Sequence, residues 1–222
     1  MARTKNGSGE YLLIAAAVFA AAWVVMGMRK GSSDEAAAAQ LPAPQAASGP
    51  LNLRGAKVLL IGSSSAVGYG LRLKTLLEGF GIAEFKNIGK SGTFLSQWSD
   101  NDKEMGKKLE ETLASYRPTV VFIFVGSNDE CGRGSGTKAP AIERLHRKLP
   151  GTRSIFIGLP PHTKWSMIRS FRDLLASTWG EDYFNTEAIN PAKAADGYHL
   201  SSAGYQTVSD ALGPWLASKQ GL

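Results

Sequence analysis

The feature that most constrains the fold is a regular alternation of short apolar runs with longer amphipathic stretches. The clearest runs, such as KVLLI at 57–61 and VVFIFV at 120–125, have the composition of buried strands, and the runs are followed by loops and by residues with helical spacing. Strands that alternate with helices form a mostly parallel sheet covered on both faces, so we expect an α/β fold, a three-layer α/β/α sandwich. The expected strands are 57–61, 84–88, 119–125, 154–159 and 183–184, and the expected helices are 71–77, 102–115, 139–149, 165–177 and 201–217.

The composition fits one folded domain with an appendage. Of 222 residues, 43% are hydrophobic and 20% are charged, which excludes a wholly disordered, collagen-like or coiled-coil chain. The single cysteine, Cys131, excludes an intrachain disulfide framework and a zinc site built on several thiolates. The net charge of +6 is scattered, and the lysines of the expected helix 102–115 alternate with glutamates that pair with them, so no nucleic-acid partner is expected.

The N-terminal fifty residues differ from the rest. A short basic segment, 1–10, precedes eighteen uncharged residues, 11–28, which as a helix span about 27 Å and so cross a bilayer core. Arg29 and Lys30 follow at once, as stop-transfer residues do, which favours a single-pass transmembrane helix over a cleaved signal peptide. A buried soluble helix would need a partner surface that the flanking polar residues do not supply.

A flexible linker follows the apolar segment. Residues 29–50 are rich in Ala, Pro and Ser, and about twenty such residues reach about 25 Å. The folded domain is therefore expected at 51–222. Basic residues flank the apolar run on both sides, so the charge pattern leaves the membrane orientation open.

The loops after the expected strands carry the unusual residues. Ligands of parallel α/β folds bind beyond the carboxyl ends of the strands. A serine of the turn 62–68 can expose its hydroxyl beside a helix N-terminus, although such turns also cap helices or cradle phosphates. The loop 87–93 supplies glycines that allow close backbone approach. Asn128, after the most apolar strand, can donate to an oxyanion or simply form a turn.

The last loop, 196–205, holds an acid three residues before a histidine. Asp196 can accept the Nδ1 proton of His199 and thereby leave Nε2 as a base, although a surface histidine near a helix start has the same pattern. His146 is expected to be a solvated residue on a charged helix face. His162 follows two prolines at a strand end and has no acidic neighbour in sequence. The three histidines lack the spacing of metal ligands, so no metal is expected.

Together these blocks resemble the SGNH hydrolases, also called GDSL-type esterases and lipases. The resemblance extends from Lys57 to about Leu216. The Gly-Asp-Ser-x-x-x-Gly pattern of that family corresponds to Gly62, Ser63, Ser64 and Gly68, its second-block glycine to Gly92, its Gly-x-Asn-Asp to residues 126–129, and its Asp-x-x-His to Asp196 and His199. Ser63 departs from the pattern because it replaces the acid of the first block.

The resemblance implies a flavodoxin-like sandwich that hydrolyses esters without a cofactor. Ser64 would be the nucleophile, with Ser63 and Ser65 as alternative assignments, and His199 and Asp196 would complete a triad. The backbone N–H groups of Ser64 and Gly92 and the Asn128 amide would bind the oxyanion. Candidates for the substrate rim are Lys90, Glu130, Arg133 and His162.

The substrate expected from these features is an O-acyl, chiefly O-acetyl, group of a cell-envelope glycan. The motive is the combination of a membrane anchor, a tether and the absence of a long hydrophobic lid. Trp98, Trp165 and Trp179 could stack on sugars, although core or surface packing is their commoner use. The alternatives are a lysophospholipase or short-chain lipase, or a catalytically disabled module. We expect a single-pass membrane protein whose domain lies on the extracytoplasmic side or in a viral membrane.

Overall fold

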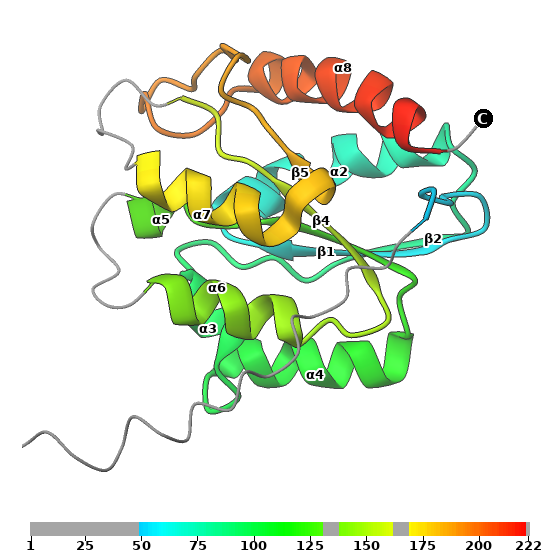
Figure 1. Ribbon diagram of the computed structural model, residues 1–222. Coiled ribbons are helices and arrows are strands. Elements are labelled where there is room, and N and C mark those ends of the chain that lie inside the picture. The colour runs from blue at the N-terminus through cyan, green and yellow to red at the C-terminus, as the bar shows by residue number, and fades with distance from the viewer. Residues whose placement is uncertain (1–48, 131–137, 162–168, 221–222) are drawn as a thin grey trace, which may run out of the picture. The chain divides into compact units, whose positions relative to one another are not determined.

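The computed structural model describes residues 49–130, 138–161 and 169–220. Its centre is a parallel sheet of five strands in the order β2-β1-β3-β4-β5 (Figure 1). The sheet is thus wound in both directions from β1, the arrangement of doubly wound α/β folds. The strands are β1 (Lys57–Gly62), β2 (Glu84–Asn87), β3 (Val120–Phe124), β4 (Arg153–Ile157) and β5 (Tyr183–Phe184).

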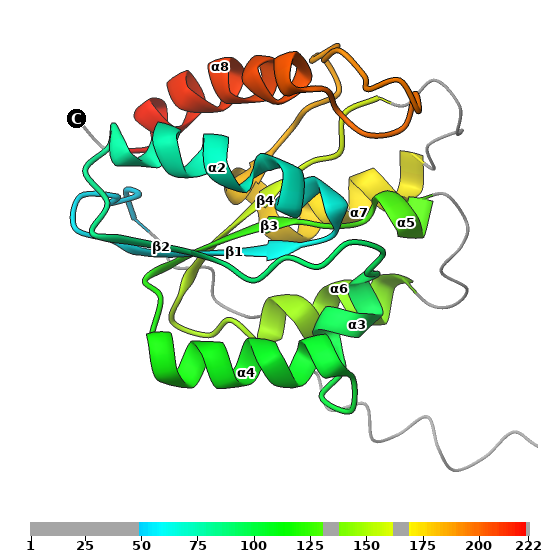
Figure 2. The same ribbon diagram turned by 180° about the vertical axis from the view of Figure 1, so that it is seen from behind.

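Helices cover both faces of the sheet. Helices α2 and α8 lie side by side on one face, and α3, α4 and α6 cover the other, as both views show (Figures 1 and 2). Helix α7 packs against α6, β4 and β5. The bounds are α2 (Ser64–Glu78), α3 (Leu95–Ser99), α4 (Glu104–Tyr116), α5 (Ser127–Glu130), α6 (Lys138–Arg147), α7 (Arg169–Trp179) and α8 (Ser202–Lys219), and a 3-10 turn, η1 (Gly180–Asp182), precedes β5.

The core lies between the sheet and its two helical layers. Every residue of β3 is buried, because a central parallel strand is covered on both faces. Trp98 is fully buried and Trp179 is 3% exposed, so both belong to the core. The idea that these two tryptophans stack on a sugar is therefore wrong, whereas the core-packing interpretation is right. Trp165 lies outside the described residues.

The predicted three-layer α/β/α sandwich with a parallel sheet is confirmed, and the five strands fall where they were expected. Helices α3 and α5 were not predicted, because helices of five and four residues are too short to display a 3.6-residue period. The predicted transmembrane helix 11–28 and nearly all of the linker 29–50 lie outside the described residues. Across the ranges that are described, no helix is long and apolar enough to cross a membrane.

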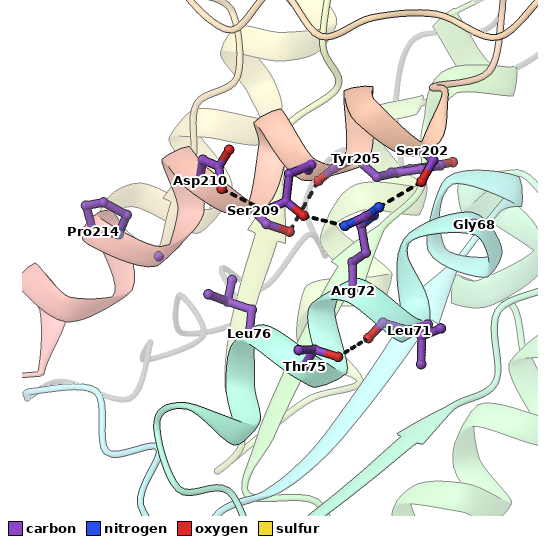
Figure 3. A pocket seen from close by; sticks show the side chains of 12 residues that line it. Gly68, Leu71, Arg72, Thr75, Leu76, Ser202, Tyr205, Ser209, Asp210 and Pro214 are labelled. Carbon is purple, nitrogen blue, oxygen red and sulfur yellow. Dashed lines mark hydrogen bonds between the residues drawn. The ribbon is translucent and has the colours of Figure 1, made fainter.

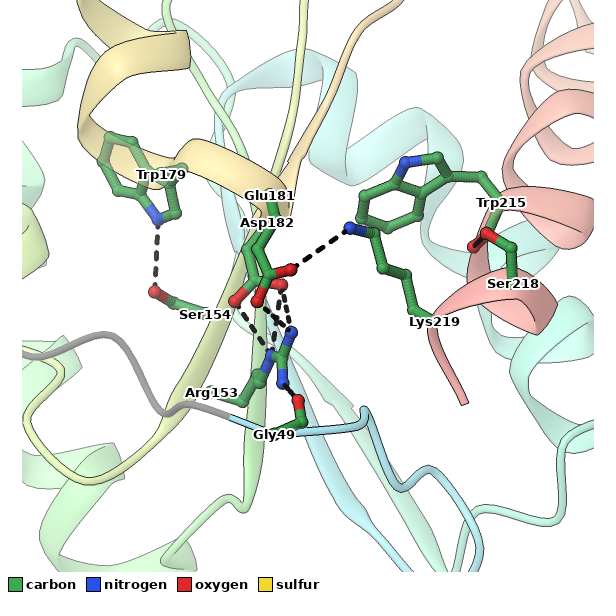
Figure 4. A network of polar contacts seen from close by, with 9 residues as sticks. All are labelled: Gly49, Arg153, Ser154, Trp179, Glu181, Asp182, Trp215, Ser218 and Lys219. Carbon is green, nitrogen blue, oxygen red and sulfur yellow. Dashed lines mark hydrogen bonds and ion pairs between the residues drawn. The ribbon is translucent and has the colours of Figure 1, made fainter. Parts of the chain in front are cut away.

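The described chain begins and ends at the amino edge of the sheet, opposite the carboxyl ends of the strands (Figure 1). The N–H of Leu51 donates to the carbonyl of Lys219 at 2.8 Å. The buried guanidinium of Arg153, at the start of β4, pairs with Asp182 at 2.6 Å and donates to the carbonyl of Gly49 (Figure 4). These contacts fasten the start of the folded domain at the edge farthest from the loops that carry the candidate site residues.

Candidate active site

Ser64 lies at the sharp turn between β1 and α2. It is the first residue of α2, where backbone N–H groups have no intrahelical acceptor and the helix dipole is positive. Gly62 makes the turn possible, because its φ is +146° and a Cβ there would lie 2.1 Å from the carbonyl oxygen of Phe124. The local geometry therefore presents the half-buried Ser64 hydroxyl at the carboxyl edge of the sheet.

Asp196 and His199 lie on a tight turn before α8. Gly197, with φ +64°, allows the chain to reverse, and the N–H of Ala194 donates to the carbonyl of His199 at 2.9 Å. The carboxylate of Asp196 accepts the backbone N–H groups of Tyr198 and His199 at 2.8 and 2.9 Å. Its other oxygen lies 2.6 Å from Nδ1 of His199.

The fold joins this turn to Ser64 across 135 sequence positions. Nε2 of His199 lies 3.1 Å from Oγ of Ser64, so the hydroxyl, the imidazole and the carboxylate form a continuous chain of hydrogen bonds. The hydrogen bond from His199, helped by the two backbone N–H groups, holds the pKa of Asp196 well below its usual range. An ionised Asp196 keeps the proton on Nδ1, which leaves Nε2 to accept the proton of Ser64.

The second and third loops meet beside Ser64. The N–H of Lys90 donates to the carbonyl of Gly62 at 2.9 Å, which ties the second loop to the first. The side-chain amide of Asn128 donates one hydrogen to the carbonyl of Thr93 at 2.9 Å, and no acceptor among the described residues takes the second. Gly92 has φ +79°, and within the described chain its N–H donates to no protein acceptor. Gly92 thus lies in a loop and Asn128 in the short helix α5, and both follow strands at the carboxyl edge of the sheet.

Tyr198 is a site residue that the sequence analysis missed. Its hydroxyl donates to Oδ1 of Asn128 at 3.3 Å, and its ring lies edge-on to His199 with centroids 4.9 Å apart. The phenol therefore orients the Asn128 amide, and its ring also contacts the His199 imidazole. The only signal in the sequence is the position of Tyr198 between Asp196 and His199.

Ser63 occupies the place of the acid in the first-block pattern. Its side chain is fully buried, and its hydroxyl lies 3.5 Å from that of Ser127 on α5. A small neutral contact between the first and third loops thus stands where the pattern has a carboxylate. The chain from Asp196 through His199 to Ser64 is complete with serine at position 63.

Asp129 supports the loop that carries Gly92. Its buried carboxylate accepts the N–H of Leu95 at 3.1 Å at the start of α3. Burial raises the pKa of Asp129 to about 6, and the Leu95 hydrogen bond and the positive charge of Lys138 oppose the rise. The third loop therefore holds α3 in place through a carboxyl group that titrates near neutrality.

The four expected rim residues are only partly described. Lys90 is exposed and pairs with Glu104 of α4 at 2.7 Å, so its charge is already balanced. Glu130 is the last residue of α5. Arg133 and His162 lie outside the described residues. In the described ranges, no group of His, Cys, Asp and Glu side chains suits a metal ion.

His146 is not the solvated residue that the sequence predicted. Its ring packs edge-on against the buried Trp179 with centroids 5.2 Å apart, and burial lowers its pKa. The contact with Trp179 places the ring of His146 on the side of α6 that packs against α7. It is thus a packing residue, remote in sequence and role from His199.

Comparisons with known proteins identify the fold. No protein-family model matches the sequence, and no curated protein is significantly similar to it. A lipase/acylhydrolase from Enterococcus faecalis aligns with 73% of this chain and 96% of its own, with a TM-score of 0.56 and 19% identity. A family 3 carbohydrate esterase from Clostridium thermocellum aligns with 75% of this chain and 99% of its own, with a TM-score of 0.57 and 19% identity. A protein from Slackia heliotrinireducens assigned to the SGNH hydrolases aligns with 73% and 100% (TM-score 0.53, 16% identity). The described part of the chain therefore has the fold of the SGNH hydrolases.

Proposed function

We propose that this protein is a serine esterase that hydrolyses carboxylic esters through an acyl-enzyme on Ser64. The observation that carries the proposal is the hydrogen-bonded chain from Asp196 through His199 to Ser64 at the carboxyl edge of a parallel sheet. A hydroxyl with a base at 3.1 Å and an ionised acid behind that base is the arrangement that activates serine for acyl transfer.

The reaction proceeds in two halves. As Oγ of Ser64 attacks the acyl carbon, its proton passes to Nε2 of His199, and the carbonyl oxygen becomes an oxyanion bound by the N–H groups of Ser64 and Gly92 and the Asn128 amide. Nε2 then gives the proton to the departing alcohol. A water molecule attacks the acyl-enzyme, loses its proton to Nε2, and releases the acid as Ser64 regains its hydrogen.

The proposed substrate is an O-acetyl group on a cell-envelope glycan, reached by a domain tethered to a membrane through residues 11–28. One structural neighbour is a carbohydrate esterase, which supports a sugar ester. The described chain begins at the edge of the domain opposite the carboxyl ends of the strands, so the proposed linker joins the domain away from the site. In this proposal the domain lies on the extracytoplasmic side.

A lysophospholipase or short-chain lipase is the second candidate, because another neighbour is a lipase/acylhydrolase. A disabled module with a binding role, in a cellular or viral membrane, is the third candidate, and Ser63 is its motive. The complete Asp196–His199–Ser64 chain argues against it.

The test compares the full-length protein in detergent micelles with Ser64→Ala and, as a matched control, Ser65→Ala. We expect wild type and Ser65→Ala to form one covalent adduct with a fluorophosphonate, read by intact mass, and to hydrolyse p-nitrophenyl acetate. Ser64→Ala should do neither. Turnover retained in Ser64→Ala would refute the assignment. Faster release of fatty acid from lysophospholipid than of acetate from an O-acetylated glycan would refute the substrate.

A further inference from the structure

A groove between α2 and α8 opens beside the candidate active site. Its volume is about 760 Å³, within the range of small-molecule sites. Leu71 and Arg72 of α2 and Ser202 and Gln206 of α8 line it (Figure 3). The mechanism described above uses none of these residues.

The two helices run parallel, and both begin at the site. Helix α2 starts at Ser64, and α8 starts at Ser202, three residues after His199. Gly68 and Ser202 line the groove at this end. With a rise of about 1.5 Å per residue, Gly68 lies about 6 Å and Leu71 about 10 Å along α2 from Ser64. The groove therefore leads away from the reacting atoms at a distance of roughly one sugar unit.

The direction of proton transfer decides which half of an ester faces the groove. His199 must give its proton to the departing alcohol oxygen, so the alcohol lies on the His199 side of Ser64. The proposed oxyanion donors Gly92 and Asn128 lie in the connections that follow β2 and β3, whereas α8 begins directly beyond the turn that holds His199. The alcohol half of the substrate is thus directed towards the start of α8 and the near end of the groove.

The lining combines apolar side chains, Leu76 and Pro214 among them, with a row of polar groups that can bind hydroxyls. Leu71 is 76% exposed and offers an apolar platform for the C–H face of a sugar ring. Beside it, the guanidinium of Arg72 donates to Oγ of Ser202 at 2.7 Å and to the side-chain oxygen of Gln206 (Figure 3). Gln206 donates in turn to Asp210 at 2.7 Å. An alkyl chain that covered these polar groups would displace water from them and offer no hydrogen bonds in return. Sugar hydroxyls would displace the same water and form hydrogen bonds in its place.

Glycine at position 68 keeps the near end of the groove narrow. A Cβ on Gly68 would lie 2.4 Å from the hydroxyl of Tyr205, so glycine leaves room for the phenol of Tyr205 against α2. Tyr69 and Ser209 join the helices by a further hydrogen bond of 3.0 Å beneath the groove. The floor is thus held by packing and does not depend on a ligand.

We propose that the groove between α2 and α8 binds the saccharide that carries the ester, with Leu71 as the platform and Gln206 and Arg72 as the hydroxyl-binding groups. This inference rests on the proposed esterase function and assigns the alcohol part of its substrate. It predicts that groove residues affect esters of oligosaccharides and leave small esters of the same acid unaffected.

The test uses full-length protein and two acetate esters, p-nitrophenyl acetate and O-acetylated chitotetraose. Gln206 is exposed, so Gln206→Ala should leave the fold and the turnover of p-nitrophenyl acetate within about twofold of wild type. We expect the KM for O-acetylated chitotetraose to rise about tenfold in Gln206→Ala, and again in Leu71→Asn. Lys74→Ala is the matched control, because Lys74 lies on α2 like Leu71 but does not line the groove. It should leave the KM and kcat for both esters unchanged.

Three results would overturn the proposal. The first is an equal rise in the KM for both acetate esters in Gln206→Ala and Leu71→Asn, and the second is an unchanged KM for the tetrasaccharide. The third is a selective loss of activity towards p-nitrophenyl octanoate, which would show that the groove binds the acyl chain. Calorimetry with chitotetraose that lacks the O-acetyl group and with the Ser64→Ala protein measures the affinity of the groove for the saccharide in the absence of catalysis. Adding Gln206→Ala to that protein should raise the Kd about tenfold. Failure of the esterase function itself is distinguishable, because it would abolish p-nitrophenyl acetate hydrolysis in the wild type.

Discussion

Replacing Tyr198 by phenylalanine tests whether the phenol orients the Asn128 amide. The substitution removes a neutral hydrogen bond of 3.3 Å to Oδ1 of Asn128 and leaves the ring beside His199 in place. Such a bond contributes about 0.5–1.5 kcal/mol, which corresponds to a fall of about 2- to 13-fold in kcat if the whole contribution is expressed in the transition state. Loss of the Asn128 donor itself should cost about 10²- to 10³-fold.

The assay is steady-state hydrolysis of p-nitrophenyl acetate by wild type, Tyr198→Phe, Asn128→Ala and the double variant. We expect kcat to fall with KM unchanged in Tyr198→Phe, and no further fall when this change is added to Asn128→Ala. Tyr116→Phe is the control, because its phenol also makes a 3.3 Å hydrogen bond, to the carbonyl of Val58 near the other edge of the sheet. Equal effects of Tyr198→Phe with and without Asn128 would refute the reasoning.

Two further predictions concern stability. Arg153→Met strands the buried carboxylate of Asp182, so urea unfolding should show a loss of about 3–5 kcal/mol, with kcat at 25 °C unchanged because the pair lies at the opposite edge. An unchanged urea midpoint would contradict this. Burial raises the pKa of Asp129 from 3.8 to about 6 on folding, so the folded protein binds the proton more tightly than the unfolded chain. This preference stabilises the folded state at low pH, and up to about 3 kcal/mol of the free energy of unfolding is lost as the pH rises from about 4 through 6. Asp129→Asn does not titrate, so its stability relative to wild type should increase between pH 4.5 and 7.5 in urea unfolding, and a constant difference would count against the prediction.

Local features of the site could be read from the sequence because they depend on short separations. The turn from Asp196 to His199 spans three residues with a glycine in the left-handed region, and the serine turn after β1 contains the glycine that its backbone requires. Strands and long helices were found for the same reason, since burial on one or two faces imposes a period on neighbouring residues.

The tertiary structure decided every feature that joins distant parts of the chain. His199 meets Ser64 across 135 positions, and Tyr198 meets Asn128 across 70. His146 looked solvated from its charged neighbours, yet the packing of α7 on α6 leaves its ring half-buried against Trp179. No local pattern encodes such contacts, because they depend on the crossovers between strands.

The sequence by itself therefore determined the layered α/β architecture and the residues at the ends of its strands. Only the tertiary structure decided how these residues are combined: His199 beside Ser64, the phenol of Tyr198 on the amide of Asn128, and the groove between α2 and α8. The physical reason is that hydrophobic periodicity reflects which faces of a single helix or strand are buried. A site, in contrast, is formed by contacts between segments that are distant in sequence. Those contacts arise when parallel strands align their carboxyl ends at one edge and two parallel helices begin there side by side.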